Sequence, residues 1–316
     1  MVGMESLLSI ELPVGETLHI KKTRLKPVNI HTGLKRISII TGIHGDELEG
    51  QYIVYELIRR IREQPEMLRG IVDIYPCINP LGMELTTRRV PTFDIDMNCC
   101  FPGNEEGDMV EQIAAGIVED ILGTDICVDI HASNIFIREI PQVRLRAEDK
   151  EKTLEYAKLL NTEFVWICES QTVLESSLCH TLNRLGVPTL ATEMGVGMRI
   201  TRQYGEQLVD GLFALMKKIG IWSGETKKIK SPVVSSDGEV KMVHAGKSGI
   251  FIPDISHWEG IEQGDVVGDI IDPAEGRVLE HILAPCSGTV FSLREYPVVY
   301  EGSLIARILS QNAVNT

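Results

Sequence analysis

Residues able to bind a metal ion follow three apolar runs of this sequence. The run at residues 37–41 leads into Gly42-Ile43-His44-Gly45-Asp46-Glu47, the run at 126–130 leads into His131, and the run at 188–192 leads into Glu193. His44 and Glu47 stand three positions apart where a helical pattern begins. Side chains at positions i and i+3 of a helical turn project to the same side, so these two can reach one ion.

Two imidazoles and one carboxylate form a donor set typical of catalytic zinc, which keeps a fourth position open. We therefore predict one Zn²⁺ per chain, held by His44, Glu47 and His131. An isolated His-x-x-Glu pair more often marks an ordinary surface histidine and glutamate at a helix start. The second histidine, directly after a buried run, favours the metal site, and Asp129 two positions earlier is a candidate hydrogen-bond partner for a ligand histidine.

Strand-like runs alternate with helix-like stretches between residues 36 and 220. The apolar runs lie at 37–41, 71–78, 126–130 and 189–191, and the helical stretches lie at 47–61, 109–122, 150–160 and 203–219. This alternation predicts an α/β fold with a mostly parallel or mixed sheet covered by helices. In such a sheet, functional groups gather beyond the carboxyl ends of the strands, so we expect the three apolar runs to bring His44, His131 and Glu193 into one crevice.

The pattern changes after Trp222. A polar, basic stretch at 224–230 is typical of a linker, and the residues beyond it form short β-rich runs without an amphipathic helix. We predict a catalytic domain at residues 1–225 and a small all-β domain at residues 226–316. The strand-like segment at 7–28 belongs to the first domain by this division, although the sequence does not say which sheet it joins.

Together, these motifs resemble the succinylglutamate desuccinylase and aspartoacylase family, relatives of the zinc carboxypeptidases. The similarity rests on Gly-x-His-Gly-x-Glu at 42–47, Asn-Pro at 79–80 with a following arginine, Asp-x-His at 129–131 and Thr-Glu at 192–193. The motifs follow the family's order over about 37–200. The resemblance implies a carboxypeptidase-like fold and a zinc-dependent hydrolase that cleaves the amide bond of a small N-acyl amino acid.

The resemblance also implies a role for individual residues. Glu193 would be the general acid/base, accepting a proton from zinc-activated water and returning it to the leaving amine. Arg88 or Arg89, in the loop after the Asn-Pro motif, would stabilise the oxyanion. Asn98 and the next residue would bind the substrate.

This chain departs from the family pattern at the second substrate-binding position. The family has Asn-Arg there, whereas this chain has Asn98 followed by Cys99. A thiol cannot make the bidentate contact that a guanidinium makes with a carboxylate. We therefore expect the substrate either to lack a free carboxylate or to be bound by another arginine, the candidates being Arg88, Arg89, Arg138 and Arg199.

Composition excludes several classes of partner. The formal net charge of −14 argues against nucleic acid and anionic membranes, the apolar runs are too short to span a bilayer, and no secretory signal pattern opens the sequence. Seven cysteines without a Cys-x-x-Cys pair indicate reduced thiols and a cytoplasmic location. The expected partner is a small N-acylated molecule, and a homo-oligomer stays open.

Two other functions and one other use of the C-terminal domain compete with this interpretation. A carboxypeptidase-like peptidase acting on short peptides would keep the zinc, but Cys99 counts against binding of a terminal carboxylate. A non-catalytic metal-binding or small-molecule-binding member would fit Cys99, but the ligands and Glu193 are all present.

The runs at 266–271 and 284–290 resemble the halves of a biotinyl or lipoyl carrier barrel, yet residues 272–279 contain no lysine. We therefore predict a structural role for this domain.

Overall fold

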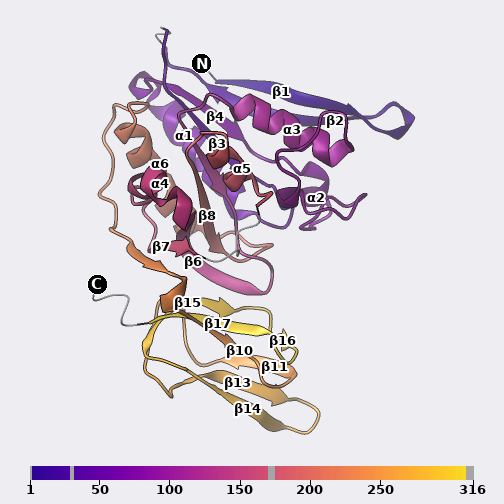
Figure 1. Cartoon of the computed structure of the whole chain (residues 1–316), viewed down its shortest axis with the longest axis vertical. Helices are drawn as coiled ribbons and strands as arrows, with labels where there is room; N and C mark the ends of the chain where they lie inside the picture. The colour runs from indigo at the N-terminus through magenta and orange to yellow at the C-terminus, as the bar shows by residue number, and fades with distance from the viewer. Residues whose placement is uncertain (1, 29–31, 170–174, 311–316) are drawn as a thin grey trace.

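The strands that precede the predicted site residues are neighbours in one large sheet. The computed structural model describes residues 2–28, 32–169 and 175–310 (Figure 1). At the centre of the sheet, four parallel strands lie in the order β4 (Ile71–Tyr75), β3 (Arg36–Thr41), β5 (Ile126–Ile130) and β8 (Thr189–Gly195). Next to β8 runs β6 (Ile137–Arg146), antiparallel to it, and then β7 (Phe164–Cys168), parallel to β6. This mixed sheet confirms the predicted fold class.

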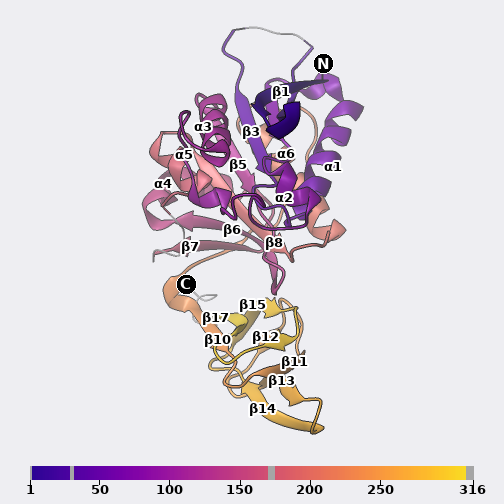
Figure 2. The ribbon, with the colours of Figure 1, turned by 90° about the vertical axis from the view of Figure 1, so that its right-hand side faces the viewer.

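Helices cover both faces of the sheet (Figure 2). They are α1 (Glu49–Glu63), α2 (Pro80–Glu84), α3 (Met109–Ile121), α4 (Lys150–Ala157), α5 (Leu178–Arg184) and α6 (Arg202–Lys218). On one face, α1 and α6 pack in a core cluster with Ile39, and on the other, α3 and α5 pack in a second cluster with Ile40. Consecutive strand residues point to opposite faces, so Ile39 and Ile40 of β3 each serve one of the two clusters. None of the helices in the described part of the chain is long and apolar enough to cross a membrane.

The N-terminal segment joins the main sheet. Strands β1 (Val2–Glu11) and β2 (Thr17–Leu25) form an antiparallel hairpin, and β2 pairs with β4. The sequence left this pairing open, because a hairpin pattern does not identify the strand beside which it lies.

The C-terminal part is built from strands, as its sequence predicts. They are β9 (Val233–Ser236), β10 (Val240–His244), β11 (Gly249–Pro253), β12 (Gly260–Ile261), β13 (Val266–Asp272), β14 (Arg277–Leu283), β15 (Gly288–Arg294), β16 (Val298–Val299) and β17 (Leu304–Ser310). Strands β14, β13, β11 and β16 form a separate sheet, whereas β9 pairs with β7 and β15 with β6, which extends the large sheet. The predicted division at residue 225 stays a prediction, and residues 311–316 lie outside the described part.

Candidate active site

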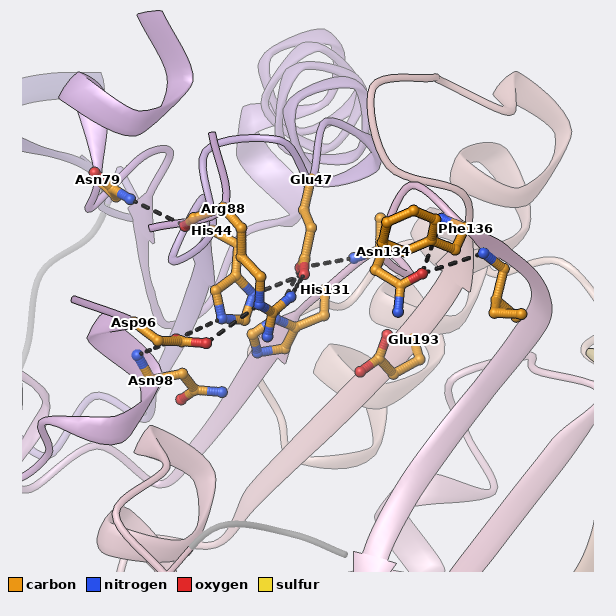
Figure 3. A network of polar contacts seen from close by, with 12 residues as sticks. His44, Glu47, Asn79, Arg88, Asp96, Asn98, His131, Asn134, Phe136 and Glu193 are labelled. Carbon is orange, nitrogen blue, oxygen red and sulfur yellow. Dashed lines mark hydrogen bonds and ion pairs between the residues drawn. The ribbon is translucent and has the colours of Figure 1, made fainter. Parts of the chain in front are cut away.

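His44, Glu47 and His131 meet beyond the carboxyl ends of β3 and β5, and each is buried (Figure 3). Their candidate ligand atoms all lie within 4.8 Å of one another. His44 Nδ1 is 2.7 Å from Glu47 Oε1, and His131 Nδ1 is 2.9 Å from Glu47 Oε2. The three side chains therefore point toward a common position, as the spacing predicts.

Two glycines allow the sharp turn that carries His44 and Glu47. Gly42 has a φ of 69°, in the left-handed region where a side chain is strained. A Cβ atom at Gly45 would lie 2.0 Å from the backbone carbonyl carbon of Gly82. The Gly-x-His-Gly pattern is thus a requirement of the backbone, which passes against α2 before α1 begins.

An aspartate contacts the second nitrogen of each imidazole. His131 Nε2 lies 3.1 Å from Asp129 Oδ2, and His44 Nε2 lies 3.0 Å from Asp96 Oδ1. Carboxylates in this position fix the tautomer of a ligand histidine and leave the other nitrogen for the metal. Asp129 is where the sequence suggests. The sequence pattern does not reveal Asp96, although it stands two positions before Asn98.

The electrostatics of the site fit a cation between the three side chains. Burial lowers the pKa of His131, but Asp129 and Glu47 outweigh it and hold the pKa well above its ordinary value. The pKa of His44 is raised by a similar balance, in which Glu47 and Asp96 overcome burial. One oxygen of Asp129, Oδ1, is buried with no hydrogen-bond partner among the described residues. These carboxylates favour positive charge, which protons on the imidazoles or a metal ion on their Nδ1 atoms can supply.

Two nitrogen donors and one carboxylate are also the donors that zinc prefers in open, catalytic sites. Burial raises the pKa of Glu47, but His44 and His131 outweigh it, so the pKa lies below its ordinary value and the group is ionised. An ionised carboxylate is the form that binds a metal. The residues therefore fit zinc in type, number and charge.

Glu193 lines the same cavity as the two histidines. The cavity has a volume of about 190 Å³, and Arg88, Asn98 and Arg144 also line it. Burial raises the pKa of Glu193, Arg144 lowers it and Glu139 raises it, which leaves a pKa of about 7. A carboxyl group with this pKa can both accept and return a proton near neutral pH.

Arg144 on β6 links Glu193 to the C-terminal strands. Its Nη1 donates to Glu193 Oε1 at 3.2 Å, and its Nη2 donates to both oxygens of Glu139 at 2.9 and 2.7 Å. Glu139 also accepts hydrogen bonds from Ser292 on β15, at 3.1 Å, and from Arg307 on β17. Residues of the C-terminal strands thus orient the arginine that contacts Glu193. The sequence pattern does not reveal this network.

The two predicted arginines occupy different surroundings. Arg88 donates to Glu47 Oε1 at 2.9 Å and to Asp96 Oδ2 at 3.2 Å, which holds its guanidinium beside the ligands. Arg89 donates to Asp94 at 3.1 Å, its side chain is 53% exposed, and it is not among the residues that line the cavity. The structure therefore brings Arg88 to the site and leaves Arg89 outside it.

Asn98 and Cys99 lie on the short 3₁₀ helix Met97–Cys99. Asn98 lines the cavity, and its Oδ1 accepts a hydrogen bond of 3.0 Å from the backbone N–H of Leu178 at the start of α5. Cys99 is exposed and does not line the cavity.

Of the four arginines considered as replacements at position 99, only Arg88 reaches the cavity. Arg138 pairs with Glu295, and Arg199 donates to a neighbouring backbone carbonyl. The cavity has two further arginines that the sequence pattern does not single out, Arg144 and Arg146.

The chain is similar to known proteins over most of its length. The sequence model of the succinylglutamate desuccinylase/aspartoacylase catalytic domain matches residues 33–219, more than half of the chain. The N-alpha-acetyl-L-2,4-diaminobutyric acid deacetylase of Halomonas elongata is 25% identical over 275 residues, which cover 84% of this chain and 80% of that protein.

Solved structures share the fold over nearly the whole chain. The succinylglutamate desuccinylase/aspartoacylase of Rhodobacter sphaeroides has a TM-score of 0.82 at 22% identity, and the match covers 97% of this chain and 94% of that one. The ectoine utilization protein EutE (DoeB) of Ruegeria pomeroyi, in its product-bound structure, has a TM-score of 0.84 at 19% identity with the same coverage, 97% and 94%. Because the catalytic-domain match spans the strands and loops that carry the site, the chain belongs to the succinylglutamate desuccinylase/aspartoacylase family.

Proposed function

We propose that this chain is a zinc-dependent deacylase that hydrolyses the amide bond of a small N-acyl amino acid. The observation that carries the proposal is the convergence of His44, Glu47 and His131 in a cavity that Glu193 also lines. The family consists of deacylases of N-acyl amino acids, and the Halomonas elongata relative is named for the deacetylation of one such compound, which supports the substrate class.

Each residue has a defined part in the proposed reaction. His44, Glu47 and His131 would hold zinc, which when bound supplies Lewis-acid chemistry that lowers the pKa of water and polarises a carbonyl. Glu193 accepts a proton from the attacking water on its carboxylate and donates it to the nitrogen of the leaving amine. Arg88 donates a hydrogen bond to the carbonyl oxygen as negative charge develops there.

The substrate contacts are assigned by their position around the cavity. We give the oxyanion role to Arg88 rather than Arg89, because Arg88 contacts Glu47 whereas Arg89 pairs with Asp94. Asn98 contributes a polar group to the cavity wall, next to Cys99. The cavity lacks the family's arginine at position 99, so the amino-acid part of the substrate must be bound by other residues.

A substrate panel with zinc-loaded protein tests the proposal. N-acyl amino acids and dipeptides of similar size are incubated with the enzyme, and the released amine is measured. A deacylase should release the amine from the N-acyl amino acids much faster than from the dipeptides. Faster cleavage of dipeptides would indicate a carboxypeptidase-like peptidase, and zinc binding without hydrolysis of either class would indicate a non-catalytic family member.

The pH dependence of kcat/KM should report the ionisation of Glu193. Only the carboxylate form accepts a proton from water, so the rate should fall as the pH drops through the pKa of Glu193. That pKa is raised from 4.5 to about 7 by burial, and a nearby zinc ion would lower it, since positive charge favours the carboxylate. The acid limb of the profile should therefore lie between pH 4.5 and about pH 7.

An Arg144→Gln variant should move this limb to higher pH without changing the zinc content. The guanidinium of Arg144 contacts Glu193 and lowers its pKa, so its removal leaves the protonated form more stable. The matched control is Arg138→Gln on the same strand, because Arg138 pairs with Glu295 away from the cavity. A limb that stays in place in Arg144→Gln would show that a group other than Glu193 controls the profile.

A further inference from the structure

One part of the active-site cavity has charged side chains that the proposed reaction does not use. Arg146 ends β6, Asp149 precedes α4, and His180 lies on α5, and all three line the cavity together with the metal-ligand histidines. The cavity therefore continues from the metal position to a region that combines a cation with a carboxylate.

Asp149 has a carboxylate at the cavity wall that makes no hydrogen bond or ion pair with the described residues. Only 9% of the residue is exposed. It precedes α4 without capping that helix through its side chain. Its oxygens are not sealed from solvent, and Arg146, His180 and Lys152 lie close enough for their positive charge to act on it. A carboxylate in the cavity wall that has no hydrogen-bond donor of its own can accept one from an ammonium group of a ligand.

Arg146 is the cavity arginine that is best able to bind an added carboxylate. Arg88 contacts Glu47 and Asp96, and Arg144 contacts Glu139 and Glu193, so each already holds two carboxylates. Among the carboxylates of the described residues, Arg146 forms an ion pair only with Glu148, at 3.1 Å, and the Glu148 side chain is 54% exposed. An exposed ion pair is weak and readily exchanged. A substrate carboxylate can thus replace Glu148 at Arg146.

A second metal ion is a weaker explanation for this region. Glu148, Asp149 and His180 lie close enough to share an ion, but Arg146 Nη1 lies 2.9 Å from His180 Nδ1 and 3.2 Å from His180 Nε2. A guanidinium already stands beside both ring nitrogens. Neither nitrogen of His180 is therefore free to bind a metal ion.

We propose that Arg146 and Asp149 bind the amino-acid part of the substrate. Arg146 binds the α-carboxylate, which Cys99 cannot bind in place of the family's arginine, and Asp149 accepts a hydrogen bond from an ammonium group on the substrate side chain. The substrate class is therefore an N-acyl diamino acid. This inference rests on the proposed deacylase function and names the substrate of that same site. The compound for which the Halomonas elongata relative is named has both groups.

Two substrates that differ only in the ammonium group test the role of Asp149. Nα-acetyl-L-2,4-diaminobutyrate is compared with Nα-acetyl-L-norvaline, which has a methyl group at the position of the ammonium. The zinc-loaded protein should prefer the diamino substrate by about 10- to 100-fold in kcat/KM, the range expected for a charge-assisted hydrogen bond. Asp149→Asn should abolish this preference by slowing the diamino substrate alone. The side chain of Asp149 does not cap α4, so the substitution should leave that helix unaffected.

Arg146→Gln tests the carboxylate contact with the same pair of substrates. It should raise KM for both acids by about 10-fold or more, while KM for the carboxamide of Nα-acetyl-L-norvaline stays the same. The matched control is Glu151→Gln, an exposed carboxylate on α4 that does not line the cavity. This control should leave KM for both substrates unchanged. An equal change for the acid and the carboxamide in Arg146→Gln would overturn the assignment of this arginine.

Calorimetric binding of free L-2,4-diaminobutyrate and free L-norvaline distinguishes failure of the site from failure of the reaction. Tighter binding of the diamino acid by the wild type than by Asp149→Asn, without hydrolysis of any N-acyl amino acid, would support the site and overturn the deacylase function. Hydrolysis of both substrates with equal kcat/KM in wild type and Asp149→Asn would overturn the site and support the deacylase. The absence of both binding preference and hydrolysis would overturn both.

Discussion

His44→Ala and His131→Ala should each abolish zinc retention, whereas the wild-type protein should carry close to one zinc per chain. Each variant loses one of only three protein donors in a site that keeps its fourth position open for chemistry. The loss also leaves Glu47 with a single histidine partner in a buried position. Metal analysis after exposure to a weak chelator, followed by gel filtration, measures the retained zinc.

His180→Ala is the matched control for this experiment. His180 is also buried and lines the same cavity, but it contacts Arg146 rather than Glu47. It should therefore keep the full zinc content. Loss of zinc in His180→Ala together with retention in both ligand variants would place the metal at Glu148, Asp149 and His180, which is the other set of donors in the described chain that lie close together.

The centre of the fold follows from the sequence because burial leaves a direct pattern there. Strands β3 and β5 are buried on both faces, so isoleucine, valine and cysteine occupy most of their positions, and the amphipathic spacing of α1 and α6 identifies helices that cover one face. One detail differs from expectation. The helix predicted from residue 47 begins at Glu49, and Glu47 lies in the preceding turn, where its N–H bonds to the His44 carbonyl.

The sequence does not reveal β6 and β7, for different reasons. Strand β6 contains Pro141, several charged residues and a register shift between Glu139 and Gln142, so its alternation is broken. Strand β7 is a run of five buried residues, and a run this short has no period that separates a strand from a helix. The catalytic sheet is therefore wider than the strand pattern indicates.

Sequence spacing predicts the site residues that stand in local motifs, but not those that are joined by long-range contacts. His44, Glu47 and His131 stand in local motifs at the ends of apolar runs, so their types and neighbours predict them. Arg144 acts through Glu193, 49 residues away, and through Glu139, which Arg307 contacts from 168 residues away. No local spacing encodes contacts at these separations. They depend on β6 pairing with both β8 and β15.

Glu193→Gln should lower kcat by about 10²-fold or more while zinc remains bound. Glutamine keeps the size and can still accept a hydrogen bond from Arg144, but it cannot take a proton from water or return one to the amine. The contact of Glu193 that the structure records is with Arg144, not with His44, Glu47 or His131. Steady-state kinetics on the best N-acyl amino acid and metal analysis of the same sample measure the two quantities together.

Glu193→Asp is the matched variant, because it keeps the carboxylate and moves it back by one methylene group. It should retain zinc and fall between wild type and Glu193→Gln in kcat, since the base is present but misplaced. A Glu193→Gln variant that loses its zinc would identify Glu193 as a ligand and require a new acid/base. Unchanged kcat in a zinc-loaded Glu193→Gln variant would assign the proton transfer to another group, and the raised pKa of Glu193 would then be only a consequence of its burial between Arg144 and Glu139.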